Sequence, residues 1–187
     1  MTALLLARHG ETDDNAPPQR VQGSRDPELN RRGRDQARAL ADRVAGEGVR
    51  ALWSSSLRRA AETAAIVGAA IGLEPRLDPR LAESDRGAWE GRLLKDIERE
   101  EPELWAAWRR AGPGFRFPGG ESLAEHEARV RASLEAVAGG PLPALVVCHG
   151  GSIRCAFARR HPRGLDAFHE LEVPNGALLR LPPDPGR

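Results

Sequence analysis

The sequence has little of several features that mark particular classes of protein. Its two cysteines, Cys148 and Cys155, cannot form a disulfide framework and lack the Cys-x-x-Cys pair of a structural zinc site. No apolar run approaches the roughly 18 residues that a membrane-spanning helix needs. Lysine is almost missing, since Lys95 is the only one. We therefore expect neither a structural zinc ion nor association with a membrane.

Arginine supplies nearly all of the 28 basic side chains, and 27 acidic side chains balance them. The arginines alternate with acidic residues, as in 31–35 and 96–100, whereas a nucleic-acid surface needs them clustered and unopposed. We expect no nucleic-acid partner.

The overall composition, 40% hydrophobic and 29% charged over 187 residues, is typical of one soluble globular domain spanning residues 1–187. The apolar segment Ala3–Ala7 has no basic region before it and Arg8-His9 after it, unlike a secretory signal. We expect a cytoplasmic protein.

Apolar runs and helical periodicities alternate along the chain. We expect strands near residues 4–7, 49–53, 145–148 and 177–181, and an extended segment at 74–81. We expect helices near 31–45, 57–71, 93–110 (broken near Pro102), 122–138 and from about 152. Ser122 and Glu125 have the spacing of a capping box. This alternation predicts an α/β fold, a three-layer α/β/α sandwich with a mostly parallel central sheet.

Three predicted strands end in polar residues. Arg8-His9 follows the first, the turn leading to Arg59 follows the second, and His149 follows the third. Carboxyl ends of parallel strands meet at one edge of the sheet, where ligands bind. Either histidine alone is as easily explained as a core residue, but together with arginines they indicate a phosphoryl or carboxylate ligand.

These residue types suit phosphoryl transfer. A histidine with one ring nitrogen held by the backbone can attack phosphorus through the other, while arginines stabilise the charged oxygens. A leaving alkoxide also needs a proton from a carboxyl group. Glu83 and Asp85, in a loop after the extended segment, are the candidates. We expect a raised pKa for Glu83, because it would be partly desolvated beside a phosphate.

In the same order along the chain, these motifs resemble those of the histidine phosphatase superfamily, also called the phosphoglycerate mutase-like family, and in particular its small phosphatases. The matching segments, which run from residue 4 to about 154, are Leu6-Ala7-Arg8-His9-Gly10-Glu11-Thr12 with Asn15, Gln22-Gly23, Gly33 with Gln36-Ala37, Ser55-Ser56-Leu57-Arg58-Arg59-Ala60 with Thr63, Leu81-Ala82-Glu83 with Gly87 and Trp89-Glu90-Gly91, Pro118-Gly119-Gly120-Glu121-Ser122, and Val147-Cys148-His149-Gly150-Gly151.

The resemblance implies a phosphoglycerate mutase-like fold, a phosphohistidine intermediate and no metal or other cofactor. It implies that His9 is the nucleophile and Glu83 the proton donor. The residues that would form the phosphate pocket are Arg8, Arg59 and His149. Those that would make further contacts with the phosphate or the substrate are Asn15, Gly23, Ser24 and Gly150. The family more often has proline just before the leucine that is Leu29 here, so the loop preceding it departs from the pattern.

The resemblance favours a phosphomonoesterase acting on a small phosphorylated metabolite, of the sugar phosphate or ribazole phosphate type. A cofactor-dependent phosphoglycerate mutase is the alternative, but mutases carry a longer insertion after the Trp-Glu-Gly region than the 26 residues between Gly91 and Pro118. An inactive phospho-ligand-binding protein is a third reading, disfavoured because the catalytic residue types are all present.

A different chemistry fits Cys148 to Arg154, which have the spacing of a cysteine-dependent phosphatase loop. Val147 and Cys155 depart from that pattern, and we expect Cys148 to be a small buried residue. We expect His126 at the edge of the core. The sequence does not decide whether four aromatic residues, Trp105, Trp108, Phe115 and Phe117, line the substrate pocket or belong to the core. It also assigns no role to His161 or His169 and does not predict the oligomeric state.

Overall fold

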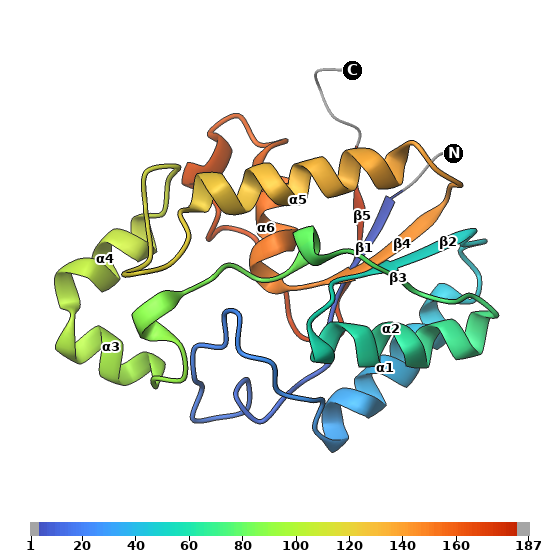
Figure 1. The fold of residues 1–187 in the computed structure, drawn as a ribbon, viewed down its shortest axis with the longest axis horizontal. Coiled ribbons are helices and arrows are strands. Elements are labelled where there is room, and N and C mark those ends of the chain that lie inside the picture. The colour runs from blue at the N-terminus through green and yellow to red at the C-terminus, as the bar shows by residue number, and fades with distance from the viewer. Residues whose placement is uncertain (1–3, 183–187) are drawn as a thin grey trace.

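The computed structural model describes residues 4–182, so residues 1–3 and 183–187 of the expected domain lie outside the described part. A five-stranded sheet forms its centre (Figure 1), with the strand order β3-β2-β4-β1-β5. The strands are β1 (Leu4–Arg8), β2 (Ala51–Ser54), β3 (Arg76–Leu77), β4 (Ala144–Cys148) and β5 (Leu178–Leu181). All neighbours pair in parallel except β5, which runs antiparallel to β1. The predicted α/β fold with a mostly parallel sheet is confirmed.

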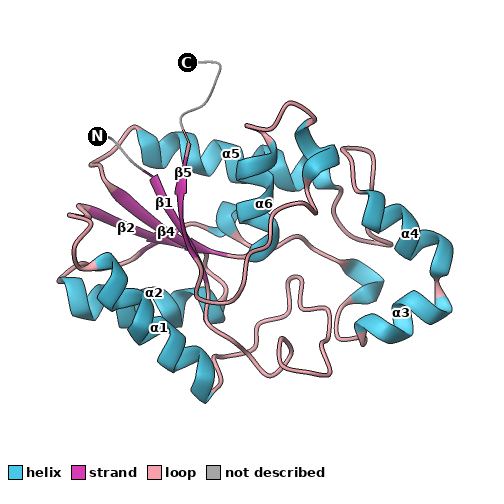
Figure 2. Ribbon diagram, turned by 180° about the vertical axis from the view of Figure 1, so that it is seen from behind, coloured by secondary structure: helices cyan, strands magenta, loops and turns pink. Residues whose placement is uncertain are grey.

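Helices cover both faces of this sheet (Figures 1 and 2). One face carries α1 (Arg31–Val44) and α2 (Arg58–Ile71), and the other carries α5 (Leu123–Ala138) and α6 (Gly150–Ala158). The shorter helices α3 (Leu94–Glu100) and α4 (Pro102–Arg110) lie beyond the sheet. Among residues 4–182, no helix has both the length and the apolar character needed to cross a membrane.

The alternation of side chains along the central strands divides the core into two layers. Leu5 and Leu145 pack toward α1 and α2, whereas Leu6 and Val146 pack toward α5 and α6. Each strand is therefore buried on both faces, which is why β1 and β4 appear in the sequence as continuous apolar runs.

Most helix boundaries follow from signals in the sequence. Helix α2 ends at Gly72, which has the left-handed conformation (φ 73°) that favours glycine. Helix α5 begins with the predicted capping box, in which the Ser122 hydroxyl accepts from the Glu125 N–H and the Glu125 carboxylate accepts from the Ser122 N–H. The predicted break near Pro102 separates α3 from α4.

Two segments differ from expectation. Only Arg76–Leu77 of the expected extended segment forms a strand, because the Asp78 carboxylate accepts from the Arg80 N–H and caps a 3-10 turn at Pro79–Leu81. Helix α6 starts at Gly150, two residues earlier than expected, directly after His149. The loop after the 3-10 turn and the start of α6 are in contact, since the Gly151 N–H donates to the Glu83 carboxylate.

A second, smaller core lies beneath α3 and α4. Trp108, Phe115 and Phe117 are buried there around Trp89, and Trp105 is partly buried against them. The aromatic residues whose place the sequence left open therefore pack mainly with one another.

Candidate active site

His9 and His149 lie next to each other at the carboxyl edge of the sheet. Each follows a strand end, and the last residues of those strands, Arg8 and Cys148, are partners in the parallel register. The His9 N–H donates to the Cys148 carbonyl over 3.0 Å, and the ring centroids are 5.1 Å apart. The structure therefore brings together the two histidines that were predicted to meet because each lies at the carboxyl end of a parallel strand.

The hydrogen bonds of His9 fix which ring nitrogen carries the proton and which has the lone pair. Nδ1 lies 2.7 Å from the Gly10 carbonyl, which can only accept, so Nδ1 carries the proton. Nε2 is then the acceptor and receives the Nε–H of Arg59 at 3.3 Å. Burial, reinforced by His149 and Arg59, holds the pKa of His9 well below its usual value. The result is a neutral imidazole whose Nε2 lone pair lies among cationic side chains.

The buried Arg59 and the half-buried Arg8 flank this histidine. Arg59, at the start of α2, donates to the carbonyls of Arg25 (2.6 Å) and Gly23 (2.9 Å), and Arg8 donates to the Val173 carbonyl (2.6 Å). Burial lowers the pKa of each guanidinium to about 10, which leaves both charged at neutral pH.

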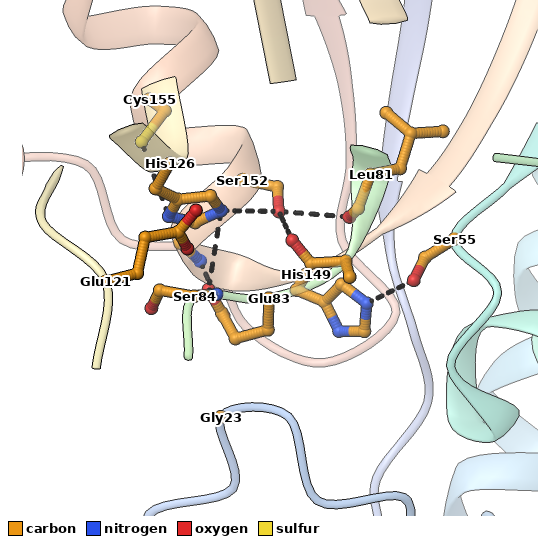
Figure 3. Close-up of polar contacts among 12 residues, drawn as sticks. Gly23, Ser55, Leu81, Glu83, Ser84, Glu121, His126, His149, Ser152 and Cys155 are labelled. Atoms are coloured by element: carbon orange, nitrogen blue, oxygen red, sulfur yellow. Dashed lines mark hydrogen bonds and ion pairs between the residues drawn. The ribbon is translucent and has the colours of Figure 1, made fainter. Parts of the chain in front are cut away.

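Unpartnered polar atoms converge on the same place. Within residues 4–182, only three buried side-chain nitrogen or oxygen atoms lack a hydrogen-bond partner, and two of them are Arg8 Nε and His149 Nδ1. The opposite ring nitrogen of His149 is fixed by the Ser55 hydroxyl at 2.8 Å (Figure 3). Buried polar groups are normally paired, so these nitrogens mark a site for a polar ligand.

Glu83 approaches this site from the loop after the 3-10 turn. Its carboxylate accepts from the N–H groups of Gly151 (3.0 Å) and Ser84 (2.9 Å). The contact with Gly151 requires glycine, because a Cβ there would lie 2.1 Å from Glu83 Oε1.

The prediction of a raised pKa for Glu83 is wrong for the enzyme without a bound phosphate. Burial alone would raise the pKa of Glu83, but Arg86 (3.9 Å away) and the two backbone N–H groups outweigh it and hold the pKa well below its usual value. Asp85, the other candidate, is exposed and its carboxylate accepts from the Gly87 N–H within a turn. Geometry therefore favours Glu83.

The remaining predicted residues occupy the rim in different ways. Asn15 Oδ1 accepts from the Asn175 amide at 3.1 Å. Gly23 contributes its carbonyl to Arg59, while the exposed Ser24 donates its hydroxyl to the Glu90 carboxylate. Gly150 begins α6 against Arg8, from which a Cβ would be 3.6 Å away. Gly23 thus positions an arginine, and the Ser24 hydroxyl is already engaged.

Two neighbours of the site were missed from the sequence. Asn175 donates to the carbonyls of His9 (3.1 Å) and Gly10 (3.3 Å), and only its place before a Gly turn hinted at a role. His126 is fully buried, not at the core edge as expected, and its Nε2 lies 3.9 Å from Glu83 Oε1. A single histidine on an apolar helix face gave no signal of this contact.

The cysteine-based alternative does not fit the geometry. Cys148 is part of the core between the sheet and α5–α6, and burial raises the pKa of its thiol to about 12. Arg154, the expected phosphate ligand of such a loop, donates instead to the Leu171 carbonyl. Cys148 is a small buried residue, as predicted.

No cluster of three or more His, Cys, Asp or Glu side chains suited to a metal ion occurs in the part of the chain that the structure describes.

Comparison with known proteins places this geometry in a family. A probable phosphoglycerate mutase GpmB of Photorhabdus laumondii is 37% identical over 187 residues, covering 97% of this chain and 85% of that protein. A phosphoserine phosphatase 1 of Hydrogenobacter thermophilus is 38% identical over 137 residues, covering 73% of this chain and 64% of the other. The structure of a mycobacterial glucosyl-3-phosphoglycerate phosphatase in complex with VO3 superposes with a TM-score of 0.85 at 33% identity, covering 96% and 90% of the two chains. The profile of the histidine phosphatase superfamily (branch 1) matches residues 4–187, and the chain belongs to that family, as its motifs predicted.

Proposed function

We propose that this enzyme is a phosphomonoesterase that transfers the phosphoryl group of a small phosphorylated metabolite to His9 and then to water. The observation that carries the proposal is the meeting of the His9 Nε2 lone pair with two buried nitrogens that have no hydrogen-bond partner, Arg8 Nε and His149 Nδ1. In the tautomer in which the Ser55 hydroxyl donates to His149 Nε2, Nδ1 carries the proton, and a bound phosphoryl group would accept from both nitrogens and present phosphorus to the nucleophile.

In the first half of the reaction, Nε2 of His9 attacks phosphorus and the bond from phosphorus to the ester oxygen breaks. Glu83 gives its proton to the departing alkoxide. A bound phosphate dianion would place negative charge against the arginines that keep Glu83 ionised, so its pKa rises on binding and it takes up the proton it later donates. In the second half, water attacks phosphorus and gives its proton to the Glu83 carboxylate, while the bond from phosphorus to Nε2 breaks, which releases inorganic phosphate and restores neutral His9.

A phosphoglycerate mutase shares the first half-reaction and is the second candidate, favoured by the similarity to the Photorhabdus protein over 97% of this chain. The short connection between Gly91 and Pro118 supports a phosphatase. A panel of phosphomonoesters, with sugar phosphates, ribazole phosphate and 3-phosphoglycerate, separates the two. A phosphatase releases inorganic phosphate, whereas a mutase accumulates 2-phosphoglycerate.

The decisive experiment compares leaving groups in Glu83→Gln. A sugar alkoxide needs a proton, whereas nitrophenolate departs unaided, so the variant should slow phosphohistidine formation from a sugar phosphate by about 10²–10⁴-fold and change nitrophenyl phosphate far less. Single-turnover quench-flow measures both rates. Equal slowing of the two substrates would show that Glu83 is not the acid.

A further inference from the structure

Behind Glu83 lies a buried polar chain that the proposed reaction does not use. His126, on α5, has no exposed surface. Its Nε2 is 3.1 Å from the Ser152 hydroxyl, and its Nδ1 is 3.7 Å from the Cys155 sulfur (Figure 3). Neither ring nitrogen hydrogen-bonds to Arg8, His9 or Arg59 in the described part of the chain. His126 therefore contacts the candidate acid without belonging to the phosphate pocket.

The hydrogen-bond partners settle where the protons of this chain lie. The Ser152 hydroxyl lies 3.2 Å from the carbonyls of Leu81 and Ala82, which can only accept, so it directs its proton there. It must then accept from His126 Nε2–H, which leaves Nδ1 to accept from the Cys155 thiol. Every donor is used, and the chain runs in one direction from Cys155 to the backbone that precedes Glu83.

The charge state of His126 agrees with this assignment. Burial, helped by Arg129 and Arg86, lowers the pKa of His126 to about 4 against the opposing charges of Glu83 and Glu121. The ring is therefore neutral near pH 7, with its single N–H on the nitrogen 3.9 Å from Glu83 Oε1.

We propose that His126 is a positioning residue for Glu83: the Ser152 hydroxyl fixes its Nε2–H, and with Nε2 3.9 Å from Glu83 Oε1 the positive side of the ring lies beside the carboxylate that forms when the proton leaves. The inference rests on the proposed role of Glu83 and adds to it a group that touches no substrate. Arg86 also faces Glu83, but it would share its charge with a bound phosphate, whereas His126 keeps the same partners throughout.

Helix α5 also anchors the backbone of the Glu83 loop, and that effect must be separated from the effect of the His126 side chain. Arg129, three residues after His126, donates to the carbonyls of Arg80 (2.9 Å), Ala82 (2.6 Å) and Glu83 (3.0 Å) and pairs with Glu121. Disturbing α5 as a whole would move this anchor. The test therefore needs a change on α5 that leaves both contacts intact.

The test compares His126→Leu, which removes the N–H, with His126→Gln, which keeps an N–H near the position of Nε2. Leu134→Ala on α5, packed against the sheet, is the matched control for loss of helix packing. If His126→Leu does not fold, His126→Met takes its place, because the flexible methionine side chain fills irregular space in a core. Rates of phosphohistidine formation are measured with a sugar phosphate and with nitrophenyl phosphate across pH.

His126→Leu should slow the sugar phosphate about tenfold, a fraction of what a general acid supplies, while nitrophenyl phosphate changes little. His126→Gln should restore most of that rate, and Leu134→Ala should leave the ratio of the two substrates unchanged. Without the positive side of the ring beside it, the carboxylate is less stable, so the alkaline fall of the sugar phosphate rate should move to higher pH.

Equal effects of His126→Leu on both substrates, or none on either, would overturn the inference. The Glu83→Gln result distinguishes this from failure of the proposed function. If Glu83→Gln shows the dependence on leaving group and His126→Leu does not, only the role of His126 fails. If Glu83→Gln shows no such dependence, the acid itself is wrongly assigned.

Discussion

The tautomer of His9 depends on one backbone carbonyl, and this gives a test at the level of single residues. With Nδ1–H held by Gly10, the lone pair of Nε2 is the nucleophile, so His9→Ala should lower turnover by on the order of 10³-fold or more. Cys148→Ser should keep activity within about threefold, since a thiol whose pKa is about 12 supplies almost no thiolate at neutral pH.

Steady-state rates with nitrophenyl phosphate and mass spectrometry of the rapidly quenched enzyme give both readouts. The labelled peptide should contain His9. An active His9→Ala together with an inactive Cys148→Ser would transfer the mechanism to the cysteine loop.

At this scale, the sequence identified residues that end strands and missed those that act through another side chain. His9 and His149 were predicted because each directly follows an apolar run, so strand geometry alone brings them together. His126 sits on a helix face with the spacing of core residues. Its contact with Glu83 arises from the approach of α5 to a loop 43 residues earlier in sequence, which no local pattern encodes.

Helix α5 is the element that connects the core to the Glu83 loop, and its first turn depends on Ser122. Ser122→Ala removes the hydroxyl that accepts from the Glu125 N–H, so the free energy of unfolding should fall by about 1 kcal/mol. Guanidinium denaturation at pH 7 measures the difference. Arg131→Ala, on the exposed face of the same helix, should change stability by less than about 0.5 kcal/mol. Equal losses in the two variants would contradict a specific capping effect.

The elements that the sequence predicted well are those with a local stop or start signal. The capping box of α5, Gly72 after α2 and Pro102 between α3 and α4 each act through their immediate neighbours. The segment around Arg76 was predicted less well, because a strand of two residues exists only through pairing with β2. The place of the aromatic residues could not be read from the sequence either, since Trp89 and Phe168, which complete their cluster, come from distant loops.

For the whole molecule, burial of neutral histidines makes stability depend on pH. The pKa values of His9, His126 and His149 are lower in the folded chain than the unperturbed 6.5, so below about pH 6.5 the unfolded chain binds more protons. Stability should therefore be fully present above this pH and fall as the pH drops toward 4, by up to roughly 1.4 kcal/mol per pH unit for each histidine.

Denaturant unfolding at intervals from pH 7.5 to 4.5 tests this, a range chosen above the unfolded pKa of most carboxyl groups, about 4. In His126→Gln, the change in the free energy of unfolding per pH unit should be smaller by the contribution of one histidine. A slope that does not change in this variant would mean that His126 is not held neutral.

The charge arrangement of the whole site leads to a prediction about metal ions. Arg8, Arg59 and His149 surround His9, and under the proposed mechanism they supply the charge stabilisation of the phosphoryl group, so catalysis should not need a divalent cation. Activity should survive dialysis against EDTA unchanged. Strong inhibition that added magnesium reverses would count against the mechanism.

The segment that holds the His9 loop lies more than 160 residues after it in the sequence, and this has a consequence for when activity first appears. Val173 accepts from Arg8, Asn175 bridges the carbonyls of His9 and Gly10, and β5 pairs with β1. Val173 and Asn175 are each more than 160 residues after the residue they brace, so the ribosome makes His9 long before these braces. A nascent chain that has not yet released this segment from the ribosomal tunnel would carry a nucleophile without its supports. The active site should therefore assemble only after this segment has emerged from the ribosome, and chains that stop before residue 173 should show no turnover.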